Sequence, residues 1–372
     1  MQDRELIGRR PFIAVGFCAL LSPAIRVLPT LALPWAGEHA WLSALAALGP
    51  FFLLALYMQR FLRSLGPGEG LAELFPRILG RLPGRLLLLL FGLWMLFYAA
   101  FVMRNAAHRF ISTIFPESAP VAYIPLMGIM ALITVLGPFR VLARMASIIR
   151  PVLVLVLMAV LAFSLPGVDL YTFSMPTAGD LLPIAKGILP ILNAVSILSY
   201  LAFLEGDVAG PKRLVRSFAG SMTLAAVLLS ALCFTTVGSF GPMLAERINN
   251  PFFVMIRNIR ILNTLERVEA LVIALWFFTD FILISSLMHA AGCALSRALG
   301  LHIRRDRPGL FSGGRWLLWL CALSSSVCAL ALAPTTEEMT RLAMAVIPEL
   351  NGLFCLILLP AIFLLGLLRR RI

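Results

Sequence analysis

Apolar residues occur along the chain in ten runs, each close to twenty residues long and separated by short polar or basic stretches. A helix needs about twenty residues to cross roughly 30 Å of hydrocarbon, and it satisfies its own backbone hydrogen bonds there. The runs therefore predict membrane-spanning helices. The ten predicted spans lie near 11–33, 39–60, 85–106, 119–137, 143–165, 182–204, 215–238, 268–296, 315–333 and 343–368.

The composition agrees with this interpretation. Of the 372 residues, 60% are hydrophobic and only 13% are charged, whereas a soluble domain needs a charged exterior. The formal net charge is +13, but the basic residues are spread over short segments between the runs and do not form one nucleic-acid surface. With the N-terminus placed inside, most of them fall in inside segments, which predicts that both termini are cytoplasmic. We expect residues 1–372 to form a single transmembrane domain.

Two predicted spans contain a basic residue between two prolines. Span one includes LSPAIRVLP (21–29) around Arg26, and span six includes LLPIAKGILP (181–190) around Lys186. Interrupted segments at corresponding positions of two halves are typical of inverted-repeat transporters. The pattern predicts a five-plus-five inverted repeat in an all-α membrane protein, with helices one and six discontinuous.

The predicted repeats cover about 11–165 and 182–368. Proline removes an amide donor and frees carbonyls, which lipid cannot satisfy, so such stretches belong against protein or a wet cavity. A basic side chain at mid-membrane costs about 2.5–3.5 kcal/mol on insertion scales. Lys186 therefore has three interpretations: it faces a ligand, it forms a structural ion pair, or it snorkels to the outer surface. Arg26 could also snorkel.

Asp280 lies near the middle of span eight, with Trp276 one turn earlier on the same face. A carboxylate at that depth must be protonated, paired or hydrated, so it is a candidate functional residue. We expect it to pair with Lys186 or Arg104. An ion pair that only fixes helix packing is the alternative.

Span three ends with a second polar group, in which Arg104 and His108 are four residues apart and share a face, with Asn105 beside them. The whole predicted ligand-binding set lies on spans one, three, six and eight: Ser22, Pro23, Arg26, Arg104, Asn105, His108, Lys186, Gly187, Asn193, Trp276 and Asp280.

The connection at 239–267 has a helix signal of its own. Asn250 can cap a helix, and Pro251 suits its first turn. The apolar residues that follow recur at helical spacing, which predicts a short amphipathic helix along the outer interface. An ordinary re-entrant connector is the alternative.

Signatures of catalysis are missing from the sequence. The GPGEG stretch at 66–70 follows no strand and lacks a lysine, and the histidines are scattered without metal-ligand spacing. We expect neither an enzyme, nor a metal site, nor a cofactor.

Several stretches resemble a known family in their order along the chain: AGEHAWLSAL (36–45), LLPIAKGILPIL (181–192), LAFLEG (201–206), NNPFFVMIRNI (249–259) and LERVEALVIALWFF (265–278). Together they resemble the permease-like B subunit of spore germination receptors (the GerAB-like family), within the amino acid–polyamine–organocation (APC) superfamily. The resemblance implies a LeuT/APC-like fold of ten helices. It also implies a small germinant, often an amino acid, and partnership with a larger A subunit and a lipoprotein C subunit, in the spore inner membrane.

Span one departs from the family pattern, because Ser22 and Pro23 stand where these proteins usually carry a glycine-containing break. The leading hypothesis is a nutrient-sensing receptor subunit that binds a small molecule near mid-membrane and signals to partner subunits. The alternatives are a stand-alone ion-coupled amino-acid transporter and a scaffold subunit that binds nothing.

Overall fold

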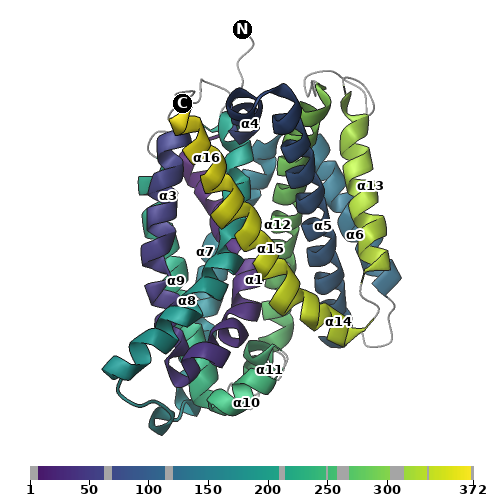
Figure 1. Ribbon diagram of the computed structural model, residues 1–372. Coiled ribbons are helices and arrows are strands. Elements are labelled where there is room, and N and C mark those ends of the chain that lie inside the picture. The colour runs from purple at the N-terminus through teal and green to yellow at the C-terminus, as the bar shows by residue number, and fades with distance from the viewer. Residues whose placement is uncertain are drawn as a thin grey trace.

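The computed structural model describes residues 7–62, 69–113, 120–208, 214–248, 250–257, 268–301, 314–332 and 335–369. Within these ranges the regular structure is helical, apart from an isolated bridge between Ile7 and Val208 (Figure 1). Seven of the helical segments in the described ranges are long and apolar enough to cross a membrane. Both termini lie at the same end of the bundle (Figure 1).

Each of the ten predicted spans falls on helical structure. The elements that cover them are α1 (Arg9–Ala36), α2 (Ala40–Ala46) with α3 (Leu48–Leu62), α5 (Arg81–Thr113), α6 (Pro120–Leu136), α7 (Phe139–Ser164), α8 (Leu181–Val195) with the 3-10 helix η5 (Ser196–Asp207), α9 (Leu214–Phe240), α12 (Val268–Leu299), α13 (Trp316–Ala331), and the rod α14 (Thr336–Arg341), η8 (Leu342–Val346), α15 (Ile347–Gly352), η9 (Leu353–Leu358) and α16 (Leu359–Leu368).

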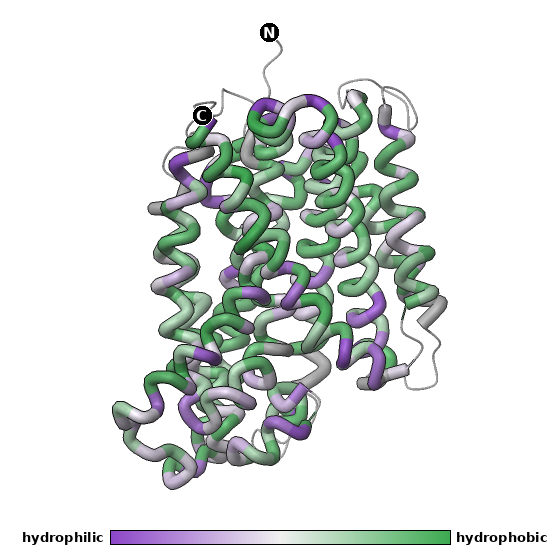
Figure 2. Tube along the Cα trace, viewed as in Figure 1, coloured by the Kyte–Doolittle hydropathy of each residue, from purple (hydrophilic) through white to green (hydrophobic). Residues whose placement is uncertain are grey.

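Three short helices lie between these spans. They are α4 (Leu71–Leu79), α10 (Pro242–Arg247) and α11 (Pro251–Arg257). Apolar residues dominate the long helices, while polar residues gather toward the two ends of the bundle (Figure 2). This is the pattern that a hydrocarbon layer around the middle requires.

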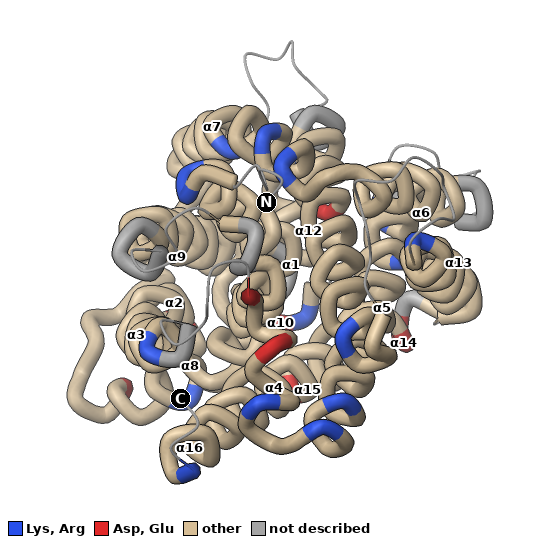
Figure 3. The backbone as a smooth tube through the Cα atoms, turned by 90° about the horizontal axis from the view of Figure 1, so that it is seen from above, with Lys and Arg blue, Asp and Glu red and all other residues tan. Residues whose placement is uncertain are grey.

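The core of the bundle is built on α1 and α12. Seen from the end with the termini, both helices lie near the centre, with α7, α9, α16, α5 and α13 around them (Figure 3). In the most apolar window of α12, 83% of the residues are buried. Side chains on α12 therefore meet other helices and not lipid, which is where a polar site can be sheltered.

The predicted interruptions of helices one and six at their proline stretches are wrong. Helix α1 continues through Pro23, Pro29 and Pro34, and α8 continues through Pro190. A proline removes only one amide donor, and neighbouring helices can compensate for this in a membrane bundle. Span six changes its form further along, where α8 gives way to η5 at Ser196. Twelve residues are unusually long for a 3-10 helix, because its hydrogen-bond geometry is poor.

The predicted short helix after Asn250 exists as α11, and its place differs from the prediction. Phe252 and Ile256 are buried among other helices, whereas an interfacial helix would turn its apolar face to lipid. The rest of that prediction, at 249 and 258–267, lies outside the described residues.

Candidate functional site

A buried ion pair joins span three to span eight. The Arg109 guanidinium on α5 donates to Asp280 Oδ2 on α12, and Ser22 Oγ on α1 donates to the other carboxylate oxygen. Asp280 is only 2% exposed and Arg109 only 8%. A carboxylate in so dry a place is held by its counter-charge and its hydrogen bonds, so these three helices are tied together at one point.

Trp276 closes this network on the side of α11. Its indole N–H donates to the Ser22 carbonyl at 3.1 Å. The rings of Phe252 and Phe253 on α11 lie 5.9 Å and 5.7 Å from the indole, centroid to centroid. The short helix α11 therefore caps the polar network with aromatic side chains. We call Ser22, Arg109, Trp276 and Asp280 the polar roof.

A small cavity lies about one helix turn from the polar roof, along α1 and α12. Its empty volume of about 230 Å³ includes space that is open to the surface, and it is bounded by α1, η5 and α12. Its wall includes Ala19 and Leu283, which are three residues from Ser22 and Asp280 respectively. Residues three apart share a helix face, so the roof stands one turn from the cavity toward α11. The full lining is Ala19, Ile197, Leu198, Tyr200, Leu201, Leu283, Ser286 and Leu287.

The prolines of α1 affect this cavity. Because Pro23 has no amide hydrogen, the Ala19 carbonyl cannot receive the usual helical bond from residue 23. Pro23 therefore frees the Ala19 carbonyl, although the helix itself continues. A carbonyl of this kind next to a cavity is an acceptor for an ammonium group.

The wall formed by η5 is held by a second polar group. Tyr200 donates to Asn351 Oδ1 at 2.9 Å and accepts from the Trp94 indole at 2.7 Å. Trp94 also reaches Asn351 at 3.2 Å, and all three residues are buried. This links η5 to α5 and α15, so the cavity wall is connected to the last predicted span.

The structure brings part of the predicted set together. Ser22, Trp276 and Asp280 form the roof with Arg109, and Pro23 is buried beside Ser22. Asn105 is buried on α5 and, four residues from Arg109, shares its face.

The residues predicted on span six lie elsewhere. Lys186 is exposed on the surface of α8 and does not line the cavity. Gly187 packs against α2, where an added Cβ would come within 2.6 Å of Ser43 Oγ. Asn193 is half-buried against Gly352. All three precede the change from α8 to η5, and the cavity lining on span six begins only after it.

The predicted partner of Asp280 is also wrong. The recorded ion pair is with Arg109, and neither Lys186 nor Arg104 forms it. Arg104 and His108 are half-buried on α5, on a face turned away from that of Arg109. Arg109 was missed as a site residue, although its four-residue spacing from Asn105 was a signal that could have found it. The side chain of Arg26 lies outside the described residues.

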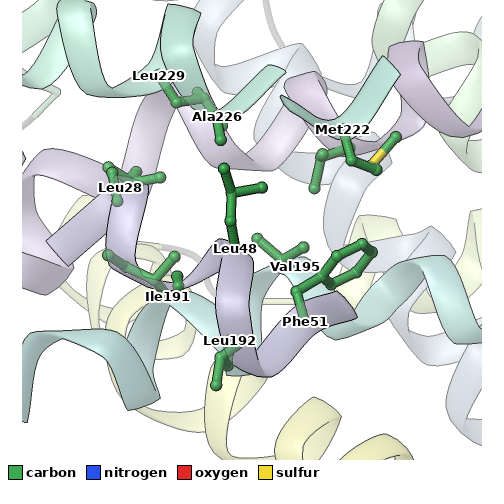
Figure 4. A pocket seen from close by; sticks show the side chains of 12 residues that line it. Leu28, Leu48, Phe51, Ile191, Leu192, Val195, Met222, Ala226 and Leu229 are labelled. Carbon is green, nitrogen blue, oxygen red and sulfur yellow. The ribbon is translucent and has the colours of Figure 1, made fainter. Parts of the chain in front are cut away.

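A second, larger pocket has an empty volume of about 390 Å³ and lies between α1, α2, α3, α8 and α9. Its labelled side chains carry only carbon and one methionine sulfur (Figure 4). Such a lining offers no partner to a charged group. The smaller cavity beneath the polar roof is therefore the better candidate for a polar ligand.

The chemistry of the roof fits binding and not catalysis. It offers one fixed cation, one fixed anion and a hydroxyl, and in the described residues no group of three His, Cys, Asp or Glu side chains could hold a metal. Both charges are already satisfied by each other. A ligand with both signs of charge could replace each partner without leaving a buried charge unpaired.

The fold is that of a membrane transporter. The structure resembles a solved Na⁺-coupled sialic acid symporter in its substrate-bound outward-open state, with a TM-score of 0.55 and 13% sequence identity. The alignment covers 96% of this chain and 82% of the symporter. Fold and site together thus define an integral membrane protein with a transporter-like fold.

The chain belongs to the spore permease family, whose model is described as "Spore germination protein" and matches residues 13–340. It is 24% identical over 306 residues to YfkT of Bacillus subtilis (strain 168), which is named as a spore germination protein, with 80% of each chain covered. This confirms the resemblance drawn from the sequence. A permease family is not an enzyme family, so the prediction on catalysis is confirmed as well.

Proposed function

We propose that this protein is the nutrient-sensing, permease-like subunit of a spore germinant receptor, and that it binds an amino acid in the cavity beneath the polar roof. The observation that carries the proposal is the buried Arg109–Asp280 pair, held by Ser22, about one helix turn from a cavity between α1, η5 and α12. The family membership and the transporter fold support it.

In this proposal an amino acid inserts its two charges between Arg109 and Asp280. The carboxylate of the amino acid binds the Arg109 guanidinium. Its ammonium group binds the Asp280 carboxylate and donates to the freed Ala19 carbonyl. Ser22 and Trp276 belong to the same network, so α1 and the α11 cap respond to the exchange. Binding then favours one arrangement of the helices by its difference in affinity for the two states.

The proposed topology has ten crossings in a five-plus-five inverted repeat, with both termini in the cytoplasm. Its support is that each predicted span falls on helical structure, and that Lys and Arg positions ring the end that holds the termini (Figure 3). A basic bias at one end is the signal that orients membrane proteins. We place the protein in the spore inner membrane, with A and C receptor subunits as partners.

Germination itself tests this function. Compared at matched protein level, spores that carry Asp280→Asn should need a higher nutrient concentration than wild type, while spores with Glu69→Gln should match wild type. Glu69 is the matched control, because its ion pair with Arg77 is partly exposed to solvent, with side-chain exposures of 31% and 41%. A wild-type dose–response in Asp280→Asn would refute the assigned site.

Ion-coupled transport by the chain alone is the second candidate, favoured by the fold shared with a Na⁺-coupled symporter. Purified protein in sealed vesicles separates the two. Uptake of labelled amino acid without partner subunits would favour transport, and binding without uptake would favour the receptor. If neither binding nor uptake occurs while the receptor complex still assembles, the scaffold alternative gains support.

A further inference from the structure

The last predicted span carries a carboxylate on its outward face. Along this rod the exposed side chains recur about once per turn and are mostly apolar, as at Leu353 (42% exposed), Ile357 (60%) and Leu364 (54%). Glu349 is exposed in the same stripe, one turn before Leu353. The stripe faces away from the bundle, where lipid chains would otherwise lie.

Glu349 is far from either end of its span. It lies eight residues from Arg341 and twenty from Arg369, which is about 12 Å and 30 Å of helix at 1.5 Å per residue. A short carboxylate side chain does not span these lengths, and an uncompensated charge facing hydrocarbon is rare and costly. A positively charged partner beside Glu349 would therefore lower the cost of this carboxylate.

The neighbouring helix α8 presents that positive charge. Lys186 is exposed on α8 between Leu182 (64% exposed) and Leu189 (60%). The two helices pack against each other, since a Cβ on Gly352 would meet the Asn193 amide. Both run toward the end that holds the termini (Figure 1).

Lys186 and Glu349 lie on the same side of that contact, away from the termini. Lys186 is seven residues from Asn193, and Glu349 is three residues from Gly352, which is about 10 Å and about 4.5 Å along their own helices. The pair is nevertheless not among the ion pairs recorded within the chain.

We infer that the outer face of α8 and α15 binds a second copy of this chain, with Lys186 of each copy paired to Glu349 of the other. A twofold axis along the membrane normal keeps both residues at their depths and makes the two contacts equivalent. One acid and one base on adjoining helices are self-complementary in this way, whereas a different partner would have to supply both signs of charge.

The inferred interface is continuous with the cavity wall. On α15, Asn351 points inward to Tyr200, two residues from the outward-facing Glu349. The short helix lies between two π-helical stretches, η8 and η9, and such irregular turns often accompany functional sites. A change at the cavity can thus reach the contact between copies through a single turn of helix.

Charge reversal tests this inference on the full-length protein in nanodiscs, with the subunit number read by single-molecule photobleaching. Wild type should be dimeric. Lys186→Glu and Glu349→Lys should each weaken the dimer by roughly a hundredfold or more, because like charges then meet at both contacts. The double variant should restore it. Single variants that dimerise like wild type, or a double variant that stays monomeric while folded, would overturn the inference.

Cross-linking gives a second test that does not rely on reversed charges. Lys186→Cys and Glu349→Cys are placed on separately tagged copies and expressed together, and a bridging reagent should link the two tags. Leu155→Cys on α7, 71% exposed, replaces Glu349→Cys as the matched control and should not link to the other tag. No link between tags, or an equal link with the control, would overturn the dimer. If both cysteines are placed in one chain and the reagent links them only within monomers, that result would also overturn the dimer.

Discussion

The buried ion pair allows a quantitative prediction about stability. Asp280→Asn keeps the size of the side chain and an acceptor for Ser22, and removes only the negative charge opposite Arg109. Asp280 is 2% exposed and Arg109 8%, so the remaining guanidinium keeps its desolvation without its carboxylate. Removing one partner of a buried pair costs about 3–5 kcal/mol. The exposed Glu69–Arg77 pair contributes only about 0–1 kcal/mol, so Glu69→Gln should be nearly neutral.

Reversible unfolding of the purified protein in mixed micelles, followed by tryptophan fluorescence, measures both variants. The double replacement Arg109→Met with Asp280→Leu should be more stable than Asp280→Asn, because it leaves no buried charge unpaired. A loss below about 1 kcal/mol for Asp280→Asn would place the pair in a wet, screened environment and refute this reasoning. A double replacement that costs more than the single one would refute it as well.

Two further variants probe the neighbours of the ion pair. Pro23→Ala restores an amide donor to the Ala19 carbonyl, so it should raise the unfolding free energy by up to about 3 kcal/mol and weaken nutrient binding. Calorimetry shows whether the two effects occur together. Stronger binding would contradict the role of the carbonyl. Trp276→Phe keeps an aromatic ring under α11 but removes the hydrogen bond to the Ser22 carbonyl. It should cost about 1 kcal/mol in the same unfolding assay, and a cost as large as that of Trp276→Ala, about 3–5 kcal/mol, would show that ring packing decides the role of the indole.

The helices could be predicted from the sequence because lipid leaves the backbone few choices. Each long apolar run needed internal hydrogen bonds, and each coincides with helical structure. The proline stretches misled the prediction of breaks, because sequence does not show whether neighbouring helices compensate for one lost donor. The long 3-10 stretch η5 has no proline between Ser196 and Asp207, so no breaker marked it.

Only part of the candidate site could be predicted from the sequence. Asp280 stood out because a carboxylate in the middle of an apolar run is costly, and that cost does not depend on the fold. Its partner could not be chosen from the sequence, since Arg104, Arg109 and Lys186 were all within reach of the same span. The choice depends on the rotation of α5 about its axis, which tertiary packing sets. Lys186 could have balanced the charge of Asp280, but it lies on the exposed face of α8.

The proposed binding site is tested most directly by titrating purified protein in nanodiscs with the standard L-amino acids, each compared with its amide, which lacks the carboxylate. Calorimetry should find at least one amino acid that binds wild type and Glu69→Gln equally well, binds Asp280→Asn at least about tenfold more weakly, and loses affinity as the amide. Wild-type affinity in Asp280→Asn, or equal affinity for the amide, would contradict a zwitterion held between Arg109 and Asp280.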